Sequence, residues 1–223
     1  MSECFLRSTI IIGDSNTLNL KFGQGKGTFG QLIPGRRQEA TFIHDINPLD
    51  CCGYKNVIIH CGINDIKHYT INDRDKVEEC FVEFRNKLSQ IMTLCPNAKI
   101  VVSPILPTKR HDLNARGMHF NRCLFDFENC SENRFSTLKF SVFRDPTTGC
   151  LGNRLGRYWN PEDALHLGSN GIRILVKLMR DQIYSSTVSS NKTYKAALTG
   201  PNASGGGMDC DVTRPHQLGS VIS

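Results

Sequence analysis

The sequence predicts an α/β fold in which a mainly parallel sheet is covered by helices on both faces. Runs of β-branched residues such as Ile10-Ile11-Ile12 and Val57-Ile58-Ile59 are typical of strands that are buried on both faces. Between such runs lie longer segments whose apolar residues recur at three- and four-residue steps, as in amphipathic helices. Strands that alternate with helices in this way form parallel sheets through right-handed connections.

The first strand ends in Gly13-Asp14-Ser15. In parallel α/β sheets ligands bind at the carboxyl ends of strands, so Ser15 stands where chemistry is expected. A short polar tripeptide also marks many ordinary turns, so it does not identify a site by itself. The glycine-rich segment 21–30 that follows lacks the Gly-Lys-Ser/Thr ending of a phosphate-binding loop, which favours a surface connection.

The later elements follow in the order expected of this fold. The pattern predicts a turn at residues 33–37, an extended piece at 40–43, a strand at 56–60, a helix at 73–95, a strand at 99–103, a helix at 113–127, a last strand at 138–143 and a final helix at 171–184. From residue 185 the chain becomes rich in serine and glycine and offers too few apolar groups to offset the entropy of ordering. We therefore expect one domain at residues 1–184 and a disordered tail at 185–223.

Composition excludes several classes of protein. The chain has 223 residues, of which 39% are hydrophobic and 22% are charged, as in ordinary globular proteins. No apolar run approaches the roughly 20 residues that span a bilayer, and no signal peptide is recognised. The ten cysteines are scattered, which favours buried free thiols in a reducing compartment and an intracellular, cytoplasmic location. The formal charge of +6 permits a nucleic-acid partner without requiring one, and nothing indicates the oligomeric state.

A pair of residues before the final helix has the spacing of a catalytic pair. Asp163 precedes His166 by three residues, so a tight turn places the carboxylate beside the imidazole and fixes its tautomer. A single histidine is more often a hydrogen-bonded structural residue. Here, however, Ser15, Asn64 and this pair all fall at positions expected to meet at one edge of the sheet.

These residues carry a resemblance to the SGNH hydrolases, also called GDSL-type esterases. Gly13-Asp14-Ser15 resembles the first sequence block of that family, and Gly62-Ile63-Asn64-Asp65 matches the G-x-N-D of the third block. Asp163-Ala164-Leu165-His166 matches the D-x-x-H of the fifth block. The resemblance covers roughly residues 7–184 in the block order of the family.

The resemblance implies a fold and a set of catalytic roles. The fold would be a three-layer α/β/α sandwich, flavodoxin-like, with a five-stranded sheet. Ser15 would be the nucleophile, His166 the base and Asp163 the residue that orients the base. No metal and no organic cofactor are implied.

The same resemblance implies an oxyanion hole. Its donors would be the backbone amides of Ser15 and Gly35 and the side-chain amide of Asn64. Gly35 is the best match to the glycine of the second block, although Gly30 or Gly27 could take its place.

Three functions remain open at this stage. The first is a serine esterase that hydrolyses short-chain acyl, lipid or acetyl esters, similar to the platelet-activating-factor-acetylhydrolase-like esterases and the esterase-like proteins of animal non-LTR retrotransposons. The second is a carbohydrate O-deacetylase, and the third is an inactive SGNH-fold interaction module of a mobile-element nucleoprotein.

Five residues near the motifs are expected to have other roles. Asp14 and Asp65 are expected to brace their loops through backbone hydrogen bonds, and Cys61 to be a packed thiol. The adjacent residues Arg36 and Arg37 either attract an anionic group towards the site or are solvated turn residues.

Overall fold

The computed structural model describes residues 9–18, 20–22, 32–33, 35–139, 157–163 and 165–184. All of them belong to Met1–Ser185, the first of two units into which the chain divides. The expected disordered tail at 185–223 lies outside the described residues.

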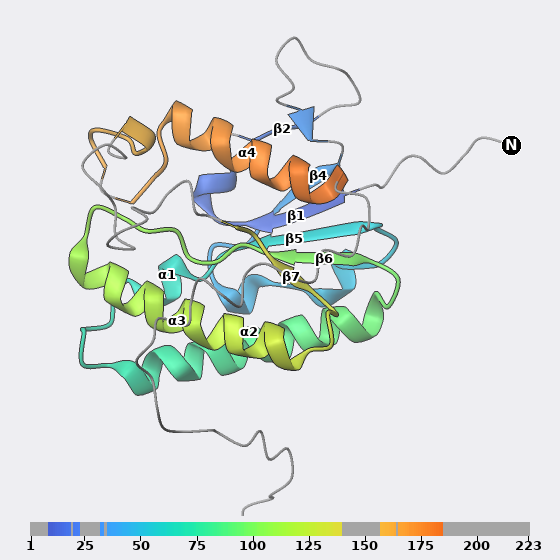
Figure 1. The fold of residues 1–223 in the computed structure, drawn as a ribbon, viewed down its shortest axis with the longest axis horizontal. Helices are drawn as coiled ribbons and strands as arrows, with labels where there is room; N and C mark the ends of the chain where they lie inside the picture. Colours follow the sequence, from blue (N-terminus) through green and yellow to red (C-terminus); the bar gives the residue numbers. More distant parts are fainter. Residues whose placement is uncertain are drawn as a thin grey trace, which may run out of the picture. The chain divides into compact units, whose positions relative to one another are not determined.

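Five parallel strands form the central sheet, in the order β4-β1-β5-β6-β7 (Figure 1). The strands are β1 (Thr9–Gly13), β4 (Arg36–Glu39), β5 (Asn56–His60), β6 (Lys99–Val102) and β7 (Ser136–Thr137). Ranked by their place in the chain, they give the order 2-1-3-4-5, which is that of flavodoxin-like folds. The predicted fold class is therefore confirmed.

Helices cover both faces of this sheet. In Figure 1, α1 (Ile63–Ile66), α2 (Arg74–Leu94) and α3 (His111–Cys130) lie on one face, and α4 (Ser169–Tyr184) lies on the other. Successive strand residues point to opposite faces, so Ile10 and Ile12 pack into the core beneath α2 and α3 while Ile11 packs beneath α4. All three isoleucines are fully buried, as their β-branched run predicts.

The register of the strands brings three chain segments to one edge. Gly13 at the end of β1 pairs with His60 at the end of β5 and with Glu39 at the end of β4. The Asp14 amide then donates to the His60 carbonyl over 3.0 Å, and the Ala40 amide donates to the Gly13 carbonyl over 3.1 Å. The loops that leave these strands therefore begin side by side.

Some predicted elements are wrong in position. The strand expected at residues 40–43 lies earlier, at Arg36–Glu39, and a 3-10 helix occupies Ile43–Asp45. This strand is at the edge of the sheet and carries charged and amide side chains, so it lacks the apolar alternation that marks a strand. The last strand is Ser136–Thr137, before the predicted 138–143, of which residues 140–143 are outside the described part.

The segment 21–30, expected to be only a surface connection, begins with one strand of a second, two-stranded parallel sheet. Its strands are β2 (Lys21–Phe22) and β3 (Leu32–Ile33). Two residues per strand are too few for any periodicity to be recognised in a sequence.

The cysteines follow the expectation of buried thiols in part. Free thiols are found at Cys51, Cys61 and Cys95, which are buried, and at Cys80 and Cys123, which are half-buried. Cys52 and Cys130, in contrast, are exposed.

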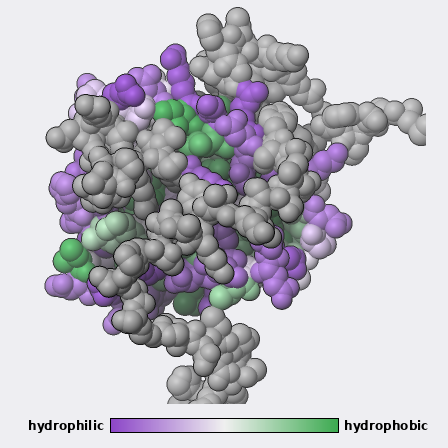
Figure 2. Space-filling view, viewed as in Figure 1, coloured by the Kyte–Doolittle hydropathy of each residue, from purple (hydrophilic) through white to green (hydrophobic). Residues whose placement is uncertain are grey.

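No helix in the described ranges is long and apolar enough to cross a membrane. Figure 2 shows a small group of hydrophobic residues over α4, surrounded by hydrophilic side chains.

Candidate active site

Ser15 lies on a short turn that the end of β1 holds rigidly. Asp14 caps the 3-10 helix Ser15–Thr17, because its Oδ1 accepts the Asn16 amide over 2.9 Å. Gly13 is required beneath this turn, since a Cβ there would lie 2.5 Å from Thr17 Cγ2. Asp14 is only 1% exposed whereas Ser15 is exposed, so the turn presents the hydroxyl at the carboxyl edge of the sheet. The expectation that Asp14 braces its loop is confirmed.

A second loop, just before α4, carries Asp163 and His166. The Asn160 amide donates to the His166 carbonyl over 3.0 Å, which closes the loop on itself. Asp163 Oδ1 accepts the Leu165 amide at 2.6 Å and the His166 amide at 3.2 Å. These two backbone bonds hold the carboxylate in place, so its other oxygen is free to face the imidazole.

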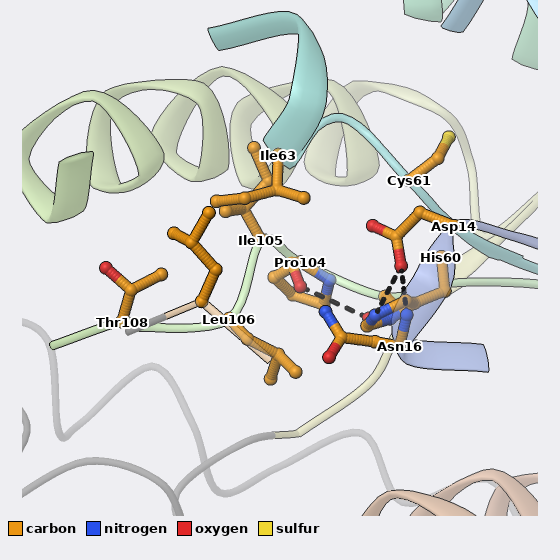
Figure 3. Close-up of a pocket in the computed structure, with 11 residues that line it drawn as sticks. Asp14, Asn16, His60, Cys61, Ile63, Pro104, Ile105, Leu106 and Thr108 are labelled. Carbon is orange, nitrogen blue, oxygen red and sulfur yellow. Dashed lines mark hydrogen bonds and ion pairs between the residues drawn. The ribbon is translucent and has the colours of Figure 1, made fainter. Parts of the chain in front are cut away.

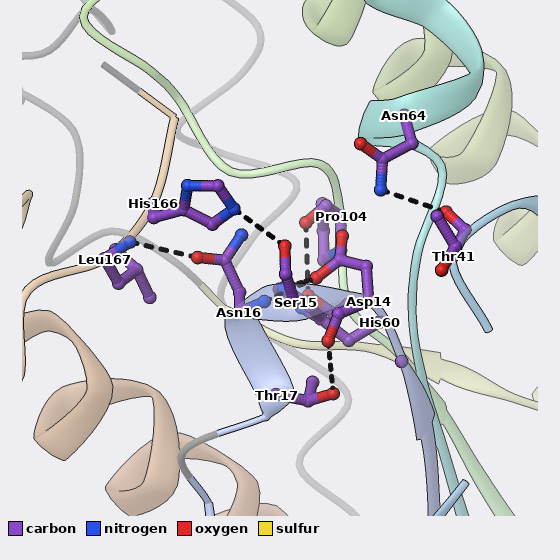
Figure 4. Close-up of polar contacts among 12 residues, drawn as sticks. Asp14, Ser15, Asn16, Thr17, Thr41, His60, Asn64, Pro104, His166 and Leu167 are labelled. Atoms are coloured by element: carbon purple, nitrogen blue, oxygen red, sulfur yellow. Dashed lines mark hydrogen bonds and ion pairs between the residues drawn. The ribbon is translucent and has the colours of Figure 1, made fainter. Parts of the chain in front are cut away.

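The two loops meet at Ser15. Ser15 Oγ lies 2.8 Å from His166 Nε2 (Figure 4). On the other side of the same ring, His166 Nδ1 contacts Asp163 Oδ2. Since a carboxylate only accepts, Nδ1 carries the proton and Nε2 is left to accept the Ser15 hydroxyl. Partial burial alone would raise the pKa of Asp163, but hydrogen bonds from the His166 side chain and from the amides of Leu165 and His166 outweigh it and lower the pKa. The carboxylate is thus ionised at neutral pH.

Asn16 joins these two loops, a role that its sequence position does not reveal. Its Oδ1 accepts the Leu167 amide over 2.9 Å, and the residue is 7% exposed. The bond links the neighbour of Ser15 to the neighbour of His166 (Figure 4). Asn16 therefore fixes the separation at which serine and histidine meet. The only sequence signal is an amide directly after the serine.

Asn64 lies at the same edge of the sheet, at the start of α1. Its Nδ2 donates to the Thr41 carbonyl over 3.0 Å, and its Oδ1 accepts Lys67 Nζ over 3.0 Å. Figure 4 shows the side chain beside Thr41, on the opposite side of Ser15 from His166. The amide is thus held from both ends, and its nitrogen has a second hydrogen besides the one given to Thr41.

The next residue, Asp65, braces the loop after β4 as expected. Its carboxylate accepts the Ile43 amide at 3.1 Å and 3.3 Å. Burial raises the pKa of Asp65 to about 6, although the Ile43 hydrogen bond acts in the opposite direction.

Gly35 lies at the wrong end of the sheet for an oxyanion hole, so that prediction is wrong. It precedes β4 and approaches Thr9 so closely that a Cβ would lie 2.0 Å from the Thr9 carbonyl oxygen. Thr9 begins β1 and Gly13 ends it, a separation of about 13 Å along the strand. Glycine is needed at this position because it has no Cβ to collide with Thr9 and because its φ of 153° is one that other residues rarely adopt. Its alternatives, Gly30 and Gly27, are outside the described residues.

The two arginines that follow Gly35 differ from each other. Arg36 is exposed, with its guanidinium 5.6 Å from the centre of the Tyr54 ring. The Arg37 guanidinium points inward and donates to the carbonyls of Gly13 and Asp14, each over 3.1 Å. Arg37 is therefore a structural residue of the Ser15 turn, and neither a solvated side chain nor a group that is free to attract an anion.

A second Ser-His-Asp set lies buried beneath the turn. His60 Nδ1 is 2.6 Å from Ser103 Oγ, and His60 Nε2 is 3.8 Å from Asp14 Oδ1. Burial lowers the pKa of His60, against the opposing effect of the Asp14 carboxylate. Ser103 is only 4% exposed, so this set supports the turn and is not reached by a substrate.

A small cavity adjoins the turn (Figure 3). Its volume of about 10 Å³ is room for a single water-sized group. Apolar and polar side chains line it, namely Asp14, Asn16, His60, Cys61, Ile63, Ser103, Pro104, Ile105, Leu106, Thr108 and Leu165. Burial, with nearby carboxylates, raises the pKa of Cys61 well above its usual range, which leaves it a packed thiol as expected.

No cluster of His, Cys, Asp and Glu that could hold a metal ion occurs within the described ranges. The arrangement at Ser15 can instead perform nucleophilic chemistry with side chains alone.

Comparison with known proteins identifies the fold. No family model and no curated protein matches the sequence. Among solved structures, a protein from Streptococcus pneumonia provisionally described as a platelet activating factor matches with a TM-score of 0.56 and 17% identity, over 82% of this chain and 86% of that one.

Two lipases match similarly. The lipase Lip_vut3 from a goat rumen metagenome gives a TM-score of 0.58 and 13% identity, over 79% of this chain and 97% of that one. A GDSL-like lipase from Bacteroides thetaiotaomicron matches with a TM-score of 0.52 and 14% identity, over 79% of this chain and 87% of that one. The chain thus has the α/β fold of these three proteins.

Proposed function

We propose that this protein is an esterase that hydrolyses carboxylic esters with Ser15 as the nucleophile. One observation carries the proposal: Ser15 Oγ is 2.8 Å from His166 Nε2, and Asp163 contacts the other nitrogen of the same ring. The nucleophile Ser15 contacts the base His166, which contacts the orienting carboxylate Asp163, as the mechanism of serine hydrolases requires. The likeness in fold to proteins named as lipases supports the choice of an ester bond.

The mechanism follows from the direction of these hydrogen bonds. As Ser15 Oγ attacks the ester carbonyl, its proton passes to His166 Nε2, and the adjacent Asp163 stabilises the imidazolium. The imidazolium then protonates the departing alcohol, which leaves an acyl group on Ser15. Water, activated by the neutral His166, releases the acid and restores the hydroxyl.

The oxyanion would be stabilised by two amides. The Ser15 backbone amide donates to no acceptor in the described part of the chain, so it is available to a developing negative charge. The second donor is the Asn64 side chain, whose nitrogen keeps one hydrogen after bonding Thr41. Each such donor contributes about 3 to 4 kcal/mol of transition-state stabilisation.

The same three residues, Ser15, His166 and Asp163, can act on acetyl, short-chain acyl and lipid esters and on acetylated sugars, so the esterase and the O-deacetylase share one mechanism. The cavity of about 10 Å³ adjoins the turn through Asp14 and Asn16, but neither Ser15 nor His166 lines it. The narrower relation to retrotransposon esterase-like proteins, and a nucleic-acid partner, rest on the sequence alone.

The test combines covalent labelling with ester turnover. A fluorophosphonate probe should label the wild-type protein at Ser15, and Ser15→Ala should abolish both labelling and hydrolysis of p-nitrophenyl acetate. Ser103→Ala is the matched control, because it removes the buried serine that also contacts a histidine, and it should still be labelled. Asn64→Ala should be labelled slowly and lose roughly a hundredfold in turnover. A folded Ser15→Ala protein with full ester hydrolysis would refute Ser15 as the nucleophile. A wild-type protein that is neither labelled nor active on the ester would favour the interaction module.

A further inference from the structure

The carbonyl oxygen of Asp14 accepts an unusual number of hydrogen bonds. Thr17 donates to it twice, from its amide over 3.0 Å and from its hydroxyl over 2.7 Å. Arg37 Nη2 donates a third bond over 3.1 Å. A peptide oxygen has two lone pairs, so three donors saturate it. This carbonyl belongs to the same peptide group as the Ser15 amide.

Arg37 also acts on the donor next to it. The Arg37 Nε donates to Thr17 Oγ1 over 2.8 Å. The Thr17 oxygen accepts this bond, and the Thr17 hydroxyl in turn donates its own hydrogen to the Asp14 carbonyl. The bonds therefore run in one direction, from the guanidinium through Thr17 to Asp14. Thr17 is fully buried, and the Arg37 side chain is 14% exposed.

The positive charge of Arg37 is barely neutralised. Its nearest carboxylate, Glu39, is 3.8 Å away and 67% exposed. Ion pairs of this exposed kind contribute little, because water screens them. The guanidinium field is therefore directed mainly at the carbonyls of the Ser15 turn.

Hydrogen bonds to a peptide oxygen strengthen the amide of the same peptide. They draw electrons towards the oxygen, so the C–N bond gains double-bond character and the N–H becomes more positive. Charge-assisted bonds have the larger effect, and bonds in a chain polarise one another. An amide prepared in this way stabilises a developing oxyanion without reorganising during the reaction.

We propose that Arg37 and Thr17 polarise the Asp14–Ser15 peptide and so strengthen the Ser15 amide as an oxyanion donor. The inference rests on the proposed esterase function. Both are positioning residues: they touch no substrate and act through the peptide group that precedes the nucleophile. In steady-state kinetics, Arg37→Gln should lower kcat and leave KM nearly unchanged, because the affected bond strengthens only in the transition state.

A trifluoromethyl ketone measures the strength of the donor directly. Ser15 Oγ adds to the ketone carbon, His166 takes the hydroxyl proton, and the carbonyl oxygen becomes an oxyanion beside the Ser15 amide. A pH titration followed by ¹⁹F NMR gives the pKa of that oxygen in the adduct. Arg37→Gln and Thr17→Val should each raise it by about one unit, a tenfold weaker stabilisation. Thr17→Ser keeps the hydroxyl and should restore the wild-type value.

Arg36→Gln is the matched control, since it removes the same charge one residue away and Arg36 is exposed over Tyr54. Its adduct should titrate like the wild type. An unchanged pKa in Arg37→Gln, or an equal shift in Arg36→Gln, would overturn the proposal. If Arg37→Gln does not fold, the difference between Thr17→Val and Thr17→Ser decides. A wild-type protein that forms no adduct at Ser15 would instead refute the esterase function itself.

Discussion

Asn16 holds the two halves of the candidate site together. The bond between Asn16 and Leu167 joins the neighbours of Ser15 and His166 without involving the reacting groups. The bond from the Leu167 amide to Asn16 Oδ1 is buried, so its loss would leave a backbone donor unsatisfied. Precise spacing of nucleophile and base is what makes the attack fast.

Asn16→Ala should therefore slow the reaction more than it weakens the fold. We expect a fall of about tenfold or more in the rate of fluorophosphonate labelling, with a loss of about 1 to 3 kcal/mol in the free energy of unfolding. Labelling kinetics and urea unfolding measure the two effects. Leu18→Ala, which truncates a side chain 61% exposed in the same turn, is the control. Equal labelling of both variants and the wild type would show that Asn16 does not set the spacing.

Residue chemistry could be predicted where the relevant partners are close in sequence. Asp163 and His166 are three residues apart, so their contact follows from one tight turn. The contacts of Arg37 and Asn16 span 20 residues or more and depend on strand register and rotamers, which a single sequence does not give. Gly35 was misplaced for the same reason, because only the register shows it beside Thr9.

At the scale of elements, Asp65 ties α1 to the 3-10 helix at Ile43–Asp45. Its carboxylate accepts the Ile43 amide, but it does so in a buried position where ionisation is costly. The pKa near 6 in the folded protein lies above the ordinary value of 3.8. Between these values the unfolded chain has released its proton while the folded chain keeps it, so stability falls as the pH rises through this window.

Asp65→Asn should remove this loss. The amide oxygen can still accept the Ile43 amide, and no charge is buried above pH 6. We expect the variant to exceed the wild type in Tm at about pH 7.5, and the difference to shrink towards about pH 4. Thermal unfolding across this range measures it. Asp75→Asn, on an exposed carboxylate in the first turn of α2, should not reproduce the trend. A variant that is less stable at high pH would indicate that the charge itself is needed.

Elements were predictable in proportion to their apolar content. The bounds of α2 and of the buried strands β1 and β5 were predicted to within one or two residues, because their buried apolar residues form a regular pattern in the sequence. The edge strands were misplaced: β4 carries Arg-Arg-Gln-Glu, and β7 has only two residues. Their pairing is decided by neighbouring strands and not by their own side chains.

The layer architecture of the described residues was predictable because each buried strand contributes alternate side chains to two cores, one on each face of the sheet. Ile11, Ile58 and Val101 face α4, while their neighbours in the same strands face α2 and α3. A sheet apolar on both faces must be covered on both, which leaves few arrangements besides a three-layer α/β/α sandwich.

The extent of the folding unit gives the final prediction. We expect a chain that ends at residue 184 to keep the Tm and the ester turnover of the full chain, because residues 185–223 are too polar and glycine-rich to add a core. A chain that ends at residue 168 is the control. It retains Asp163 and His166 but lacks α4, whose Leu175, Val176 and Met179 are buried against the sheet, so it should not fold. A marked drop in Tm or turnover for the chain ending at residue 184 would mean that the last 39 residues (223 − 184) bind the domain at residues 1–184.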